Sequence, residues 1–157
     1  MRHKARDNGG KALLVCSPGG HLLQLVALEP SWRGLERHWV TSRGPDVDHL
    51  LKGESVTFGY GPAVGNRRPA DVLRNMALAW RLIRRHDPAV IVSTGAGLAV
   101  PFFLVGRLLG RRLVYVECVS RVGFSLAGRV IYWLADAYFV QWPQAARARA
   151  RYAGRLL

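Results

Sequence analysis

Short apolar runs alternate with longer segments of helical period along most of the chain. The apolar runs are rich in Val and aromatic residues, and they predict strands at residues 12–16, 38–41, 55–58, 90–93, 113–116 and 137–141. Apolar positions at helical spacing predict helices at residues 21–29, 70–85, 98–109 and 125–135. Strands that alternate with helices form βαβ units, so the pattern predicts an α/β fold with a parallel sheet.

The length of 157 residues suits one domain with a substantial core. An enzyme built from two nucleotide-fold halves needs about twice this length, so its other half would have to lie on a separate chain. We expect residues 1–10 to form a disordered tail and residues 11–143 to form the folded domain. Residues 144–157 are basic and weakly periodic, which predicts a basic tail or an exposed helix.

The formal net charge of +13 calls for an acidic partner, either nucleic acid or an anionic membrane surface. From residue 88 onward the only acidic residues are Glu117 and Asp136. Cys16 and Cys118 lie in apolar runs without metal-ligand spacing, which predicts small buried residues in a reducing compartment. We expect no metal or other cofactor, no secretory signal and no membrane-spanning helix.

A glycine-rich loop, residues 17–21, follows the first predicted strand. Its two glycines permit a tight turn, and the helix behind it offers unpaired N–H groups to a phosphate. We therefore predict that Ser17, Gly19 and Gly20 bind substrate or phosphate. His21 begins the helix, where the dipole disfavours imidazolium, so a neutral His21 would be able to accept a proton; a capping or packing histidine is the alternative.

A second glycine loop, residues 93–97, follows the fourth predicted strand. Thr94, Gly95 and Gly97 are predicted to bind substrate or phosphate there, through a hydroxyl and exposed backbone at a helix start. The next helix is apolar nearly all round and ends in basic residues. This pattern is typical either of a buried helix or of an apolar patch that settles into the headgroup region of an anionic membrane.

Glu117 stands where the fifth predicted strand ends, as the single carboxylate of a long apolar and basic stretch. One interpretation is a structural salt bridge to Arg121 or Arg129. The other is a catalytic carboxylate that accepts hydrogen bonds from a sugar hydroxyl or positions it. Ligands of open parallel sheets bind beside loops that leave the carboxyl ends of the strands, which is where all three of these loops lie.

Three segments together carry a family resemblance: VCSPGGHLLQLVAL, STGAGLAVP and YVECVSRVGFSLAGRVIYWLADAYFVQWP. They resemble the acceptor-side subunit of two-component glycosyltransferases, which include the bacterial PssD-type exopolysaccharide subunit and the eukaryotic subunit that recruits its catalytic partner for transfer to dolichol diphosphate. More distantly, the chain is similar to the N-terminal half of MurG. The resemblance covers about residues 12–143, and the three motifs in combination are far more specific than any one glycine loop.

The resemblance implies a GT-B glycosyltransferase split over two chains, with this chain as the Rossmann-like, acceptor-binding half. A catalytic partner would hold most of the UDP-sugar, so we expect a heterodimer. The positions that match the family's two glycine loops, histidine and glutamate are Gly19, Gly20, His21, Gly95, Gly97 and Glu117. Eukaryotic members have an N-terminal transmembrane helix, but here only ten charged and polar residues precede the first predicted strand, which implies peripheral attachment at the cytoplasmic face of the membrane.

The expected reaction is transfer of a sugar from a UDP-sugar to a polyprenyl-diphosphate-linked saccharide in polysaccharide biosynthesis, with inversion implied by the resemblance. His21 is the expected base, or the group that orients the attacking hydroxyl. Arg67, Arg68 and Arg121 are candidates for contacts with the acceptor diphosphate, because arginine pairs well with phosphate oxygens.

Two other functions fit the same sequence. A non-catalytic membrane adaptor would recruit the catalytic partner and would not need His21 or Glu117 for turnover. A basic α/β domain would bind nucleic acid through its arginine-rich C-terminal half, with steep salt dependence. The chain has no basic strand interleaved with aromatic residues and no recognition helix, so we expect no nucleic-acid partner.

Overall fold

The computed structural model describes residues 10–62 and 68–156. The strands are β1 (Lys11–Val15), β2 (Glu36–Thr41), β3 (Val56–Phe58), β4 (Val90–Ser93), β5 (Arg112–Val116), β6 (Ala137–Val140) and β7 (Ala150–Tyr152). The α-helices are α1 (Gly20–Ala27), α2 (Glu29–Trp32), α3 (Val47–Leu50), α4 (Pro69–His86), α5 (Ala99–Leu108) and α6 (Leu126–Leu134). A short 3₁₀ turn, Pro143–Ala145, precedes β7.

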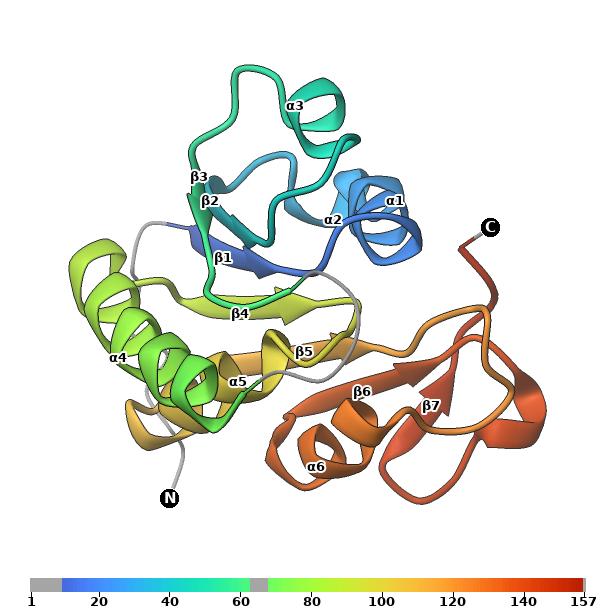
Figure 1. Cartoon of the computed structure of the whole chain (residues 1–157). Coiled ribbons are helices and arrows are strands. Elements are labelled where there is room, and N and C mark those ends of the chain that lie inside the picture. Colours follow the sequence, from blue (N-terminus) through green and yellow to red (C-terminus); the bar gives the residue numbers. More distant parts are fainter. Residues whose placement is uncertain (1–9, 63–67, 157) are drawn as a thin grey trace.

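All seven strands form one parallel sheet in the order β3-β2-β1-β4-β5-β6-β7 (Figure 1). The six strands and four long helices expected from the hydrophobic pattern are all present, with ends that differ by one or two residues. The α/β, Rossmann-like prediction is therefore confirmed. The strand order reverses direction between β1 and β4, and open parallel sheets bind ligands at such a switch point.

The alternation of side chains along the central strand β1 divides the interior into two cores. Leu13 and Val15 point into a core formed with α4, α5 and α6. Ala12 and Leu14 point into a second core formed with α1, α2 and α3. The sheet is thus sandwiched between two layers of helices, one on each face (Figure 1).

Helix α5 decides between the two interpretations of its apolar sequence. Most of its side chains are buried, including Phe102 and Phe103, and only Leu104, Arg107 and Leu108 are exposed. At its far end Arg111 forms an ion pair with Asp87. Helix α5 is therefore a core helix. Its exposed residues are too few to form an apolar membrane patch by themselves.

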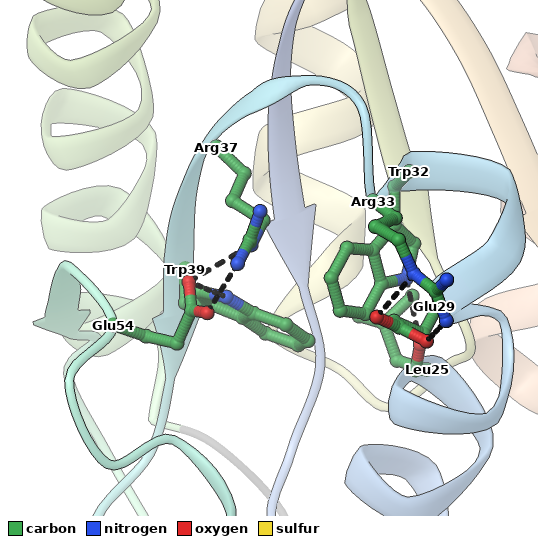
Figure 2. A network of polar contacts seen from close by, with 7 residues as sticks. All are labelled: Leu25, Glu29, Trp32, Arg33, Arg37, Trp39 and Glu54. Carbon is green, nitrogen blue, oxygen red and sulfur yellow. Dashed lines mark hydrogen bonds and ion pairs between the residues drawn. The ribbon is translucent and has the colours of Figure 1, made fainter.

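Two tryptophans and an ion pair connect α1 and α2 with strand β2 and the segment before β3 (Figure 2). Trp32 Nε1 donates to the Leu25 carbonyl at 2.9 Å, and the Trp32 ring packs edge-on against Trp39 at 5.4 Å between centroids. Glu54 accepts hydrogen bonds from Trp39 and Arg37, at 3.1 and 2.9 Å. The contacts of Trp32 hold α2 against α1 and β2, while Arg37 and Glu54 tie β2 to the segment before β3.

The C-terminal segment differs from the expected basic tail or exposed helix. Residues 150–152 form β7, which pairs with β6 and extends the sheet beyond the expected domain boundary at residue 143. Ala150 is buried while Arg149 and Arg151 on either side are exposed. Tyr152 is exposed as well, so β7 is an edge strand of which Ala150 alone lies on the core.

Candidate functional site at the carboxyl edge of the sheet

Three loops lie side by side at the carboxyl ends of β1, β4 and β5, which are neighbours in the sheet. The loop after β1 contains Ser17 and leads to His21 at the start of α1. The loop after β4 contains Thr94 and Gly95, and the loop after β5 begins at Glu117. The structure thus brings the three segments singled out in the sequence to one edge, at the switch point of the strand order.

His21 is held by the β4 loop through two hydrogen bonds. Its Nδ1 lies 2.9 Å from the carbonyl oxygen of Thr94, and the Thr94 hydroxyl donates to the His21 carbonyl at 2.5 Å. Gly95, with φ of 127°, makes room for the imidazole, because a Cβ there would lie 2.8 Å from the ring. With Nδ1–H donating to a carbonyl, Nε2 carries the lone pair of the neutral ring.

The pKa of His21 is shifted in the direction opposite to the one that a helix N-terminus favours. Burial lowers the pKa of His21, but a hydrogen bond with the Cys118 side chain, the charge of Cys118, the Thr94 carbonyl and Glu117 raise it. The net pKa lies above its ordinary value of 6.5. A helix N-terminus disfavours imidazolium, but at this position specific anionic and acceptor groups outweigh the dipole.

The backbone of the first loop is only partly free to meet a phosphate. Gly19 and Gly20 are exposed, but the Gly19 N–H already donates to Asp46 at 2.7 Å. Ser17 is 2 % exposed, and its hydroxyl has no partner among the described residues. Gly97 is exposed just before α5. The first loop therefore offers the exposed backbone at Gly20, and the β4 loop offers the exposed backbone at Gly97, while the Ser17 hydroxyl is buried.

Glu117 is 1 % exposed and its carboxylate is occupied by the protein itself. Its Oε2 accepts from the Tyr138 hydroxyl at 2.6 Å and from the Ser125 N–H at 3.2 Å, while its Oε1 accepts from the Cys118 N–H at 3.2 Å. Gly128 permits this approach, since a Cβ there would lie 2.1 Å from Oε2. The carboxylate therefore ties β5 to β6 and to the start of α6, and a sugar hydroxyl has no open path to it.

The arginines expected near the acceptor diphosphate fall in different places. Arg121 is exposed in the β5 loop, beside the site. Arg68 is exposed at the N-cap of α4, and Arg67 lies outside the described residues. No ion pair joins Glu117 to Arg121 or Arg129 in the described part of the chain, so the salt-bridge interpretation of Glu117 is wrong.

Two site residues escaped the sequence analysis. Gln24, one turn after His21 on α1, is 1 % exposed and donates to the Cys118 sulfur at 3.4 Å. Cys118 also lies 3.0 Å from the Ser120 hydroxyl. Gln24 interrupts the apolar run of α1. A polar residue at a buried position was the feature of the sequence that could have indicated a site here.

An apolar groove of about 400 Å³ lies on the sheet face that carries α1, α2 and α3. Its floor is formed by Val92, Val114 and Phe139 of the three strands β4, β5 and β6, and its sides are formed by Trp32 and the segment 153–156. No helix of residues 10–62 or 68–156 covers this half of the face. The strand residues of the floor are accordingly half-buried.

A family model described as oligosaccharide biosynthesis protein Alg14 like matches residues 67–156. The UDP-N-acetylglucosamine transferase subunit ALG14 of Yarrowia lipolytica is 30% identical to the chain over 184 residues, covering 99% of this chain and 85% of that protein. A second relative, from a Polaromonas species, is named UDP-N-acetylglucosamine--N-acetylmuramyl-(pentapeptide) pyrophosphoryl-undecaprenol N-acetylglucosamine transferase. It is 29% identical over 90% of this chain but only 41% of its own length.

Solved structures show the same fold. MurG of Acinetobacter baumannii superposes with a TM-score of 0.74 at 18% identity, over 90% of this chain and 44% of that one. UDP-N-acetylglucosamine 2-epimerase of Rickettsia bellii superposes with a TM-score of 0.70 at 8% identity, over 93% and 45%. The match of the family model to more than half of the chain, together with the Yarrowia relative, establishes that this protein belongs to the Alg14-like family.

Proposed function

We propose that the chain is the acceptor-binding subunit of a heteromeric, inverting glycosyltransferase. A partner chain binds most of the UDP-sugar, and the sugar passes to a polyprenyl-diphosphate-linked saccharide in polysaccharide biosynthesis. The observation that carries the proposal is the relative from Yarrowia lipolytica, which is named as a subunit of a UDP-N-acetylglucosamine transferase and is covered over 85% of its length. A subunit acts together with at least one other chain.

His21 is the proposed proton acceptor. The Thr94 carbonyl occupies Nδ1, so Nε2 is the nitrogen available to a hydroxyl of the acceptor sugar. As this hydroxyl oxygen bonds to the anomeric carbon of the donor, its proton moves to Nε2, the bond from that carbon to the UDP oxygen breaks, and UDP leaves. A base whose pKa lies near the working pH is suited to this step.

The acceptor diphosphate requires donors and positive charge close to His21. The exposed backbone at Gly20 and Gly97 supplies the proposed donors, and exposed Arg121 is the proposed cation. Glu117 acts through structure, since it holds the start of α6 and the β5 loop in place. We therefore assign Glu117 as a positioning residue.

The apolar groove is the proposed docking face for the catalytic partner. It lies on half of a sheet face that no described helix covers, and Val92, Val114 and Phe139 form an apolar floor. Parallel sheets are ordinarily covered on both faces, so this surface requires a partner. A partner side chain or helix seated there would complete the second layer of the sandwich.

Attachment to the membrane is the role proposed for the opposite layer. Large apolar side chains are exposed on all three of its helices: Leu73, Trp80, Leu104, Leu108, Leu126, Val130 and Trp133. Within the described chain no helix has the length and hydropathy to span a bilayer. Exposed Trp and Leu beside many arginines are typical of a protein that rests on an anionic bilayer, and we propose the cytoplasmic face.

The test is reconstitution with a UDP-sugar-binding partner encoded beside this chain. A panel of labelled UDP-sugars is supplied with a polyprenyl-diphosphate saccharide, and lipid-linked product is measured for each chain alone and for the pair. We expect product from the pair only. Full activity of this chain alone would defeat the two-subunit proposal, and a pair that keeps wild-type activity with His21→Ala and Glu117→Gln would favour a non-catalytic adaptor.

A further inference from the structure

The loop after β5 is held at two points by side chains from other elements. Trp142, which follows β6, donates its Nε1–H to the Val119 carbonyl at 2.8 Å. The ring of Phe124 stacks on the ring of Tyr138 with 5.0 Å between centroids. Residues 119–124 therefore form an arch between two fixed ends, which we call the β5 arch.

The aromatic rings at the two ends of the β5 arch carry arginines of the C-terminal segment. The guanidinium carbon of Arg147 lies 4.2 Å from the ring centre of Phe124, and that of Arg155 lies 4.7 Å from the ring centre of Trp142. Cation–π contacts stabilise the placement of both rings. The basic C-terminal segment thus uses two of its charges within the molecule, and the arch is preorganised for a ligand.

The middle of the β5 arch is exposed and combines a cation with apolar side chains. Arg121 is exposed, and within residues 10–62 and 68–156 no carboxylate forms an ion pair with it. Val122 beside it is 57% exposed, and Leu126 at the start of α6 is 80% exposed. Two large apolar side chains in water next to this guanidinium favour a ligand that has both an apolar and an anionic part.

The β5 arch lies where the candidate site meets the apolar stripe of α6. It starts two residues after Glu117, at the carboxyl edge of the sheet, and it ends two residues before α6 begins. Leu126, Val130 and Trp133 lie on one side of α6, since they are four and three residues apart, and all three are exposed. A lipid whose apolar chain follows this stripe therefore brings its charged end to the arch.

We propose that the β5 arch receives the diphosphate end of the lipid-linked acceptor. The Arg121 guanidinium pairs with oxygens of the diphosphate, and Val122 and Leu126 pack against the first prenyl units. Trp142 and Phe124 are positioning residues, because they act through the arch that they hold. The inference rests on the proposed function, which assigns a polyprenyl-diphosphate saccharide as the acceptor.

An anionic phospholipid also joins an apolar chain to a phosphate, so the first experiment compares the two lipids. Cosedimentation of the full-length chain is measured with phosphatidylcholine vesicles that contain either polyprenyl diphosphate or phosphatidylglycerol at equal charge. We expect binding to polyprenyl diphosphate to be about tenfold tighter, because a diphosphate offers the guanidinium more oxygens. Equal binding to the two vesicles overturns the inference and leaves a general anionic-membrane surface.

Substitutions separate the β5 arch from the general charge of the surface. Arg121→Gln should remove the preference for polyprenyl diphosphate, and Val122→Ser should lower it severalfold through the lost apolar contact. Arg129→Gln removes an equal charge at an exposed position of α6, so it should weaken binding to both vesicles and keep the preference. A preference that survives R121Q overturns the proposal, and one that survives V122S removes the prenyl contact from it.

A double-mutant cycle tests the positioning role of Trp142. Trp142→Phe keeps a ring for Arg155 but removes the hydrogen bond to Val119, so the arch loses one fixed end. We expect it to lower the preference in the wild-type chain and to have no further effect in R121Q, because both changes act through one group. Trp133→Phe, the same substitution on the exposed stripe of α6, should keep the preference. Wild-type preference in W142F, or losses that add in the double variant, contradict the positioning role.

The last experiment places the β5 arch in the reaction. In the reconstituted two-chain enzyme, Arg121→Gln should raise KM for the polyprenyl-diphosphate saccharide about tenfold and leave KM for the UDP-sugar unchanged, since the arch binds only the acceptor. An active R121Q enzyme with wild-type KM for the acceptor refutes the arch, while the two-subunit function stands. If no partner restores transfer but the lipid preference depends on Arg121, the proposed function fails and the arch stands.

Discussion

The two helical layers differ in how they handle charge and apolar surface. Residues 20–54, which include α1, α2 and α3, contain five acidic and four basic residues, and ion pairs such as Arg37 with Glu54 balance them. Residues 68–156, which include α4, α5 and α6, contain four acidic and fourteen basic residues. The first layer carries the chemistry and the groove, while the second presents a basic, partly apolar surface.

This difference shows that the net charge of +13 is unevenly distributed over the chain. It comes mainly from one half of the chain, and that half also exposes Leu126, Val130 and Trp133 along one stripe of α6. Nucleic acid would need basic groups without such an apolar stripe, whereas an anionic bilayer uses both. The following predictions test whether the two layers have separable roles.

The largest effect is expected at His21, in the first layer. His21→Ala in the reconstituted pair should lower turnover by about 10²–10⁴-fold, because it removes the proposed base. Binding to anionic vesicles should not change. His49→Ala on the exposed surface of α3 is the matched control and should keep wild-type turnover. Wild-type turnover in H21A would remove this residue from catalysis.

The second effect concerns the stripe on α6. Leu126 and Trp133 are 80% and 70% exposed, so replacing both by Ser should not unfold the chain. Each buries apolar area worth about 2 kcal/mol in a bilayer, and the double variant should therefore bind vesicles at least tenfold more weakly. Cosedimentation measures the change. Leu23→Ser, at a 48% exposed position in the opposite layer, is the control; an equal loss in L23S would erase the contrast between the layers.

A third prediction tests how the second layer is attached to the sheet. Gly128→Ala places a Cβ 2.1 Å from the Glu117 carboxylate and 2.5 Å from the Tyr138 hydroxyl. Relief requires α6 to move or the buried hydrogen bonds to break, so the free energy of unfolding should fall by about 1–3 kcal/mol. Urea unfolding gives the value. Ala127→Gly on the same helix should cost about 1 kcal/mol by helix propensity alone.

The smallest expected effect is a change of stability with pH, caused by two histidines that connect β2 and α4. His38 stacks on His86 with 4.2 Å between ring centroids, and burial followed by the charges of His86 and Arg85 lowers the pKa of His38 to about 4. The unfolded chain binds a proton near pH 6.5 and the folded chain does not, so stability should fall as pH drops from 6.5 towards 4, by about 1–2 kcal/mol. The fall should be smaller in His38→Gln, measured by urea unfolding across this range, and the part that remains should come from His86, whose pKa is also lowered by burial.

The sequence was sufficient for elements that bury a continuous apolar run or a full helical stripe. It did not predict α2 and α3, because four residues hold too few positions for a period to appear. It also missed β7, a strand of three residues of which only Ala150 is buried. The abundance of arginine there suggested a solvated terminus, and pairing with β6 decided otherwise.

The candidate site could be predicted only where its residues lie next to a predicted strand. His21, Thr94 and Gly95 follow strands directly, so the parallel sheet brings them together once its strand order is known. The environment of Glu117 was not predictable, because Tyr138 and Gly128 reach it from other elements. The hydrogen bond from Gln24 to Cys118 likewise joins α1 to the β5 loop, and no local pattern contains it.

The hydrogen bonds between His21 and Thr94 also bear on how the protein acquires its site during folding. They join residues 73 positions apart, across the pairing of β1 with β4. Closing so long a loop is entropically costly, and contacts of this kind form slowly. The N-terminal strands and helices are synthesised long before β4, but the two halves of the site can meet only when the centre of the sheet closes.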